Sequence, residues 1–166
     1  MDIGLIIRIG HVVGTVLGVG GATMAEIFYL KAMRDDGKID EKEGGFLKVV
    51  YSVLRWGMVL LVLSGFGFLI LYRIQGVEER LYNPRLWAKL VLTLIIVINA
   101  LLLQTRKISF PWGSAISLTS WYAALVLGLW RGLEAGFWEI MLWIAGITVV
   151  VYLAQGAVRK ALRIKV

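Results

Sequence analysis

Three ionisable side chains lie within the first apolar segment of the chain, residues 3–32: Arg8, the only histidine (His11) and Glu26. Histidines inside a membrane serve as proton relays or as metal ligands. A single histidine with no cysteine or carboxylate at ligand spacing makes a poor zinc site, whereas haem iron needs only one or two protein donors. His11 is therefore a candidate axial ligand of haem iron.

The polar groups of this segment share one face of the predicted helix. At about 100° per residue they fall in a single stripe with small residues between them. The members of this stripe are Gly4, Arg8, His11, Thr15, Gly18, Ala22 and Glu26. Because a charged side chain that faces lipid is costly, we expect the stripe to face the interior of a helix bundle. Its small residues would let another helix or a flat ligand approach closely.

Further polar residues are predicted to join this stripe at two depths. Near its inner end, Arg55 of the second segment reaches a depth similar to that of Glu26, and we expect these two residues to form an ion pair. The alternative is that Arg55 snorkels to the interface. Near the outer end, three charged residues share the depth of His11: Arg8, Lys89 and Glu139. This density of ionisable groups has two interpretations. The residues are interfacial anchors joined by salt bridges, or they line a polar pocket that opens outward around His11.

Two uncharged residues complete the predicted pocket or proton relay. Thr15 lies on the stripe one turn after His11. Asn99 lies near the middle of the third segment, where asparagine more often bonds a neighbouring helix than a ligand.

Five helices must position these residues. The chain has 166 residues, of which 59% are hydrophobic, compared with roughly 45–50% in soluble domains. A helix needs about 20 apolar residues to cross a bilayer, and five segments meet this length: residues 3–32, 46–72, 86–103, 112–130 and 135–158. The fold class is therefore all-α integral membrane, a five-transmembrane-helix bundle. Residues 1–166 are expected to form a single polytopic domain, with the first segment retained rather than cleaved as a signal peptide.

Local signals mark where three of these helices begin. Asp40 followed by Glu43 has the spacing of a capping box at the start of the second helix. Pro84 and Pro111 each come just before a span, where a missing amide donor costs nothing.

The basic residues predict the orientation. With the N-terminus outside, the inner joints and the C-terminus hold eleven lysines and arginines: Lys31, Arg34, Lys38, Lys42, Lys48, Arg106, Lys107, Arg159, Lys160, Arg163 and Lys165. The outer joints hold five: Arg73, Arg80, Arg85, Lys89 and Arg131. This bias predicts an outside N-terminus and a cytoplasmic C-terminus in the cell membrane. The net charge of +7 thus suits lipid head groups rather than nucleic acid, and the absence of cysteine excludes disulfides.

Part of the chain resembles a known superfamily. A histidine in a glycine-rich first helix, an arginine-bearing second helix with LVLSGFG, and NPRLWAKLVLTLIIVINALLLQ opening the third are similar to features of small bacterial inner-membrane proteins. These include the CopD-type copper-resistance proteins and the membrane-bound protoporphyrinogen oxidases. The resemblance spans about residues 8–104. It implies a haem-binding bundle in which His11 matches the first-helix ligand and Lys89 the third-helix lysine.

The chain departs from this pattern at one position that matters. Where the family has a second histidine after the lysine, this chain has Asn99, with Gln104 beyond. The resemblance therefore implies haem b that is five-coordinate, weakly ligated on its second side or shared across a dimer. A relative that has lost its cofactor is equally consistent.

Three functions follow as hypotheses. The first is a haem-associated redox protein in which His11 binds iron, Arg8 and Lys89 hold porphyrin carboxylates, and Glu139 assists proton transfer. The second is a proton or ion channel or transporter that uses the stripe from Arg8 to Glu26. The third is a structural or assembly subunit of a membrane complex. Expected partners are membrane lipid and either further copies of the chain or a larger membrane complex.

Overall fold

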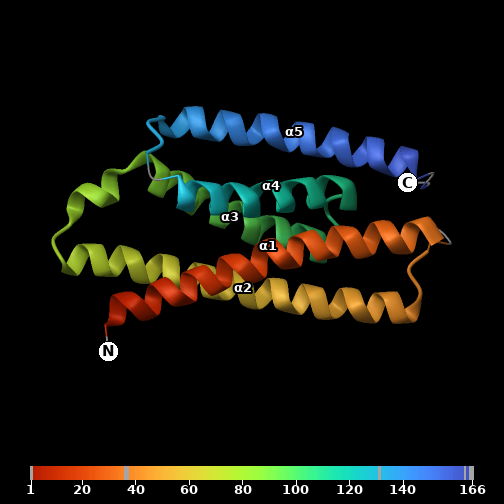
Figure 1. The fold of residues 1–166 in the computed structure, drawn as a ribbon, viewed down its shortest axis with the longest axis horizontal. Helices are drawn as coiled ribbons and strands as arrows, with labels where there is room; N and C mark the ends of the chain where they lie inside the picture. Colours follow the sequence, from red (N-terminus) through yellow and green to blue (C-terminus); the bar gives the residue numbers. More distant parts are fainter. Residues whose placement is uncertain (1, 36–37, 131, 163, 165–166) are drawn as a thin grey trace.

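The computed structural model describes residues 2–35, 38–130, 132–162 and 164. In chain order these residues form α1 (Ile3–Asp35), α2 (Glu41–Ile74), the 3-10 helix η1 (Glu78–Tyr82), α3 (Pro84–Gln104), α4 (Phe110–Leu129) and α5 (Phe137–Ala161). The α-helices run back and forth, so α1 begins at one end of the bundle and α5 finishes at the other (Figure 1). All five are long and apolar enough to cross a membrane, which confirms the predicted helical membrane class.

Short-range signals set the beginnings of α2, α3 and α4. The side chain of Asp40 accepts a hydrogen bond from the backbone N–H of Glu43 at 2.7 Å, and Glu43 accepts one in return from the N–H of Asp40 at 3.1 Å. The predicted capping box is therefore confirmed. Asn83 caps α3 with a single side-chain hydrogen bond, which its Oδ1 atom accepts from the N–H of Arg85 at 2.9 Å. Pro84 and Pro111 lie in the first turns of their helices, as expected.

The first two helices are longer than the sequence predicts. The expected spans were residues 3–32 and 46–72, whereas α1 has 33 residues and α2 has 34. At 1.5 Å per residue each is roughly 50 Å long, against about 30 Å for the hydrocarbon core. In Figure 1 the α1–α2 hairpin extends beyond α3 and α4 where α1 ends and α2 begins. The polar end of this hairpin thus continues as helix past the apolar stretch.

Glycines bring α1 and α2 into backbone contact. A Cβ added to Gly57 of α2 would lie 2.9 Å from the backbone N of Gly18 and 3.0 Å from the backbone O of Gly14. A Cβ added to Gly21 would lie 2.8 Å from the side chain of Leu54. The predicted close approach at the glycines is therefore made by a helix, as in other small-residue membrane contacts.

Two apolar clusters hold the five helices together. In the first, Trp121 of α4 is 1% exposed and fills the space left by Gly18 of α1, so that any side chain at Gly18 would overlap the indole ring. This cluster also holds Ala22, Leu61 and Ile96, which join α1, α2 and α3. The second cluster joins α3, α4 and α5 through five buried residues: Ala88, Leu92, Leu127, Ile140 and Ile144.

The outside of the bundle is apolar. Large side chains that a soluble protein would bury are more than half exposed on several helices, among them Val16, Leu63, Ile70, Leu142 and Leu153. Such a surface suits acyl chains rather than water, in agreement with the membrane class.

Candidate functional site

The carboxylate of Glu26 lies at the centre of a buried polar network. Its Oε1 atom is 3.1 Å from Nη2 of Arg159 on α5, and its Oε2 atom accepts a hydrogen bond from the hydroxyl of Ser114 on α4. The amide of Gln155 donates to the same Ser114 hydroxyl at 3.1 Å. The network ties α1 to α4 and α5, and its members are all less than a tenth exposed.

An aromatic ring covers the cation of this network. The guanidinium of Arg159 lies over the ring of Tyr29, with 5.7 Å to its centroid. Tyr29 in turn stacks on Phe110, with 3.8 Å between ring centroids. Because the Arg159 guanidinium is buried away from water, this cation–π contact stabilises the charge in addition to the ion pair.

The predicted ion pair between Glu26 and Arg55 is wrong, because Arg159 takes the carboxylate. The reason lies in the register of α1 against α2. Gly18 faces Gly57, Gly21 faces Leu54, and each step forward along α1 is matched by one step back along α2.

On this register Arg55 lies level with Gly20. Glu26 is six residues further along α1, an axial offset of roughly 9 Å. The predicted depths of the two residues were therefore not similar enough for contact.

Arg159 is a residue of this network that sequence reasoning missed, as are Ser114 and Gln155. It was counted among the basic residues of the cytoplasmic end, whereas α5 continues to Ala161 and carries it on a buried face. Its spacing of four residues from Gln155 places both polar groups on one helix face. That spacing was the signal in the sequence that could have indicated a polar, inward-facing side of the last helix. Arg131, Arg163 and Lys165, which were also counted, lie outside the described residues.

A cavity of about 420 Å³ lies beside the network, and we call it the α2–α3 cavity. Its exposed lining residues, which include Arg55, Ala100 and Gln104, belong to α2 and α3, whereas its lining residues on α1, Ala22 and Ala25, are buried. The cavity therefore opens sideways, between α2 and α3. Its polar lining residues are Tyr51, Arg55, Asn99, Gln104, Ser114 and Ser117, and its remaining walls are apolar.

Two polar side chains in the cavity wall have charge or hydrogen-bonding groups that no described residue satisfies. Arg55 forms no ion pair or hydrogen bond within the described part of the chain, although it lies inside an apolar helix. Asn99 is 4% exposed and donates from Nδ2 to the carbonyl oxygen of Gly113 at 2.8 Å. Its Oδ1 atom is buried and accepts no hydrogen bond. Asn99 thus bonds a neighbouring helix, as predicted, and keeps one acceptor for a further partner.

His11 is held by α2. Its Nδ1 atom is 2.9 Å from the hydroxyl of Ser64, and its ring meets Phe68 edge to face with 5.4 Å between centroids. Thr15 is buried and donates its hydroxyl hydrogen bond back to the carbonyl oxygen of His11 at 2.8 Å. Lys89, which was predicted at the same depth, is half-buried on α3 and forms no hydrogen bond with His11.

The other two residues of the predicted outer group are exposed. Arg8 and Glu139 have exposed side chains, and neither is joined to His11 by a hydrogen bond or ion pair in the described ranges. The α1 stripe therefore faces inward from Thr15 to Glu26, and it turns outward at Arg8.

Among the described residues, no three histidine, aspartate or glutamate side chains come together in an arrangement that could hold a metal ion. The chain matches no family model, no curated protein and no solved structure.

Proposed function

We propose that this protein binds an anionic amphiphile, taken from the bilayer, in the α2–α3 cavity. Its setting in this proposal is the cytoplasmic membrane, with the N-terminus outside and the C-terminus in the cytoplasm, as the positive-inside bias favours. The observation that carries the proposal is Arg55, an intramembrane cation that has no counter-charge within the described residues and lines a cavity.

The charge of Arg55 supports an anionic ligand. Ionisable residues inside a membrane usually pair with one another or mark a path or binding site. Glu26 would neutralise Arg55, but Arg159 already holds that carboxylate. An arginine fork is suited to a carboxylate or phosphate, which it can bind with two parallel hydrogen bonds.

The rest of the lining supports an amphiphile rather than a small ion. The volume of about 420 Å³ falls within the range of roughly 300–1,000 Å³ typical of small-molecule sites. Arg55, Asn99 and Gln104 contribute polar atoms to the lining, while Met58 and Trp121 contribute apolar wall. The opening between α2 and α3 would admit a ligand from the lipid phase without passage through water.

The test is a titration of the purified protein with a fluorescent long-chain fatty acid and with the matching fatty alcohol. The acid should bind more tightly than the alcohol. Arg55→Gln should lower the affinity for the acid about tenfold or more, since hydrogen bonds to charged groups contribute about 1.5–3 kcal/mol. Ser117→Phe, which fills the cavity, should abolish the binding of both probes.

The matched control is Lys48→Gln, which removes an exposed cation of α2 that does not line the cavity. It should leave both affinities unchanged. Equal binding of acid and alcohol by the unmodified protein, or an Arg55→Gln variant with full preference for the acid, would contradict the proposal.

Haem at His11 is a second proposal, and the contact with Ser64 favours it. Histidines that bind metals usually have their other ring nitrogen held by a hydrogen bond. Here Ser64 holds Nδ1, while Nε2 has no hydrogen bond to any described residue. The residues present fit one axial ligand. Gly14 and Gly18 give no room for a porphyrin, because α2 and Trp121 fill the space beside them.

A hemin titration tests this second proposal. The protein should acquire a Soret band that is lost in His11→Ala and kept in Arg55→Gln. A colourless protein in excess hemin would exclude haem binding.

An ion path along the α1 stripe receives less support, because Arg159 holds Glu26 and Trp121 covers Gly18. The role of an assembly subunit stays a prediction.

A further inference from the structure

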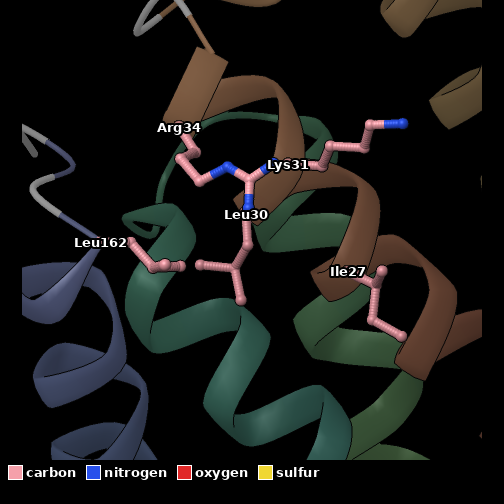
Figure 2. Close-up of a pocket in the computed structure, with 5 residues that line it drawn as sticks. All are labelled: Ile27, Leu30, Lys31, Arg34 and Leu162. Atoms are coloured by element: carbon pink, nitrogen blue, oxygen red, sulfur yellow. The ribbon is translucent and has the colours of Figure 1, made fainter.

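A shallow groove of about 290 Å³ lies where α1 ends beside the end of α5. It is separate from the α2–α3 cavity and shares no lining residue with it. Five residues line it: Ile27, Leu30, Lys31, Arg34 and Leu162. Figure 2 shows Leu30 and Leu162 side by side, with the side chain of Arg34 above Leu30 and that of Lys31 extending away from the helix. The groove thus combines three apolar side chains with two cations.

The level of the groove in the bundle matches the membrane interface. Tyr29 stacks on Phe110, the first residue of α4, so this level marks where α4 begins. Ile27 lies on the bilayer side of Tyr29 along α1, whereas Lys31 and Arg34 lie on the far side, in the last turns of the helix. An apolar floor below two cations matches the order of groups in an anionic phospholipid, whose phosphate lies above its acyl chains.

The charge of this end of the bundle points to an anionic lipid. α1, α3 and α5 end here, and α2 and α4 begin here (Figure 1). Exposed cations gather at this end: Lys31, Arg34, Lys38, Lys42, Lys48, Arg106, Lys107 and Lys160. Basic clusters beside a membrane attract anionic head groups more strongly than zwitterionic ones.

Arg159 does not belong to this set, since it is 3% exposed and bound to Glu26. Lys31, by contrast, is exposed and forms no ion pair within the described ranges.

We propose that this groove binds an anionic phospholipid, with the phosphate at Lys31 and Arg34 and the upper acyl chain against Ile27, Leu30 and Leu162. This site is independent of the amphiphile bound in the α2–α3 cavity. It anchors the end of α1 to the end of α5, on the side opposite the contacts that α1 makes with α2.

The experiment is native mass spectrometry of the full chain in detergent with added phosphatidylglycerol, phosphatidylcholine or inorganic phosphate. Phosphatidylglycerol should bind most tightly. Each of Lys31→Gln and Arg34→Gln should weaken its binding about fivefold, as expected for the loss of one interfacial charge. Lys107→Gln, which removes an exposed cation of the same end outside the groove, should have no effect.

Three results would overturn the proposal. If phosphatidylcholine bound as tightly as phosphatidylglycerol, the charge of the head group would not determine binding. Competition by inorganic phosphate at similar concentration would show an anion site without a lipid. Loss of phosphatidylglycerol binding in Arg55→Gln, with Lys31→Gln unaffected, would assign the lipid to the α2–α3 cavity instead. Because Lys31 is exposed and forms no ion pair or hydrogen bond with a described residue, Lys31→Gln should keep the melting temperature of the lipid-free protein, which serves as the folding check.

Discussion

The Oε1 atom of Glu26 lies 3.1 Å from Nη2 of Arg159, and this contact joins the first helix to the last. The two residues are separated by almost the whole chain, so the pair closes the bundle. α5 otherwise rests against α4 and α3. Because the pair is buried and also bonded to Ser114, it fixes the position of α5, and it leaves Arg55 without the counter-charge that the sequence suggested.

Arg159→Gln should destabilise the protein by about 3–5 kcal/mol, since it leaves the Glu26 carboxylate buried without its cation. Thermal unfolding in detergent, followed by tryptophan fluorescence, measures the loss. The double variant Glu26→Gln with Arg159→Gln should recover part of it, because no uncompensated charge remains. Arg55→Gln is the matched control and should leave the melting temperature almost unchanged. A loss in Arg55→Gln as large as in Arg159→Gln would contradict the observed pairing.

Gly57→Ala should destabilise the α1–α2 contact, because its Cβ would press on the backbone of α1 at Gly14 and Gly18. Overpacking of this kind costs about 1–3 kcal/mol. Gly20→Ala is the matched control, since no atom lies within 4 Å of the added Cβ. That variant should be neutral or slightly stabilising, owing to the better helix propensity of alanine. Melting temperatures of the two variants in the same detergent decide the matter, and equal values would show that the close contact is absent.

The hydrogen bond between His11 and Ser64 should couple α1 to α2 weakly. Such bonds in membrane proteins contribute about 0.6 kcal/mol on average, and up to about 1.7 kcal/mol. A double-mutant cycle with His11→Ala and Ser64→Ala, read from unfolding free energies, gives the coupling directly. Purely additive effects of the two substitutions would mean that the imidazole and the hydroxyl do not meet.

The orientation can be tested because the chain has no cysteine. Gln75→Cys places a thiol between α2 and α3, and Ser109→Cys places one between α3 and α4; both positions are exposed. With the N-terminus outside, a membrane-impermeant maleimide should label intact cells only at position 75. Position 109 should react after the membrane is opened. The reverse pattern would place the basic end of the bundle outside and overturn the orientation that the positive charges favour.

The sequence by itself determined the class of the molecule and the approximate limits of its helices. Hydropathy and length predicted five spans, and Asp40 with Glu43, Pro84 and Pro111 predicted three helix beginnings. These features depend on neighbours within a few residues, so local chemistry is sufficient to specify them. The inward direction of Thr15 and Glu26 was also predictable, because exposure of such groups to lipid is costly.

Only the tertiary structure decided which charges meet. Gly57 fixed the register of α1 against α2 through backbone contacts, and this register put Arg55 level with Gly20 rather than with Glu26. The path of α5 then brought Arg159 to the carboxylate. Neither fact follows from depth along single helices, because a shift of a few residues between two helices is governed by packing across their whole interface. The α2–α3 cavity, which carries the proposed function, is a product of the same packing.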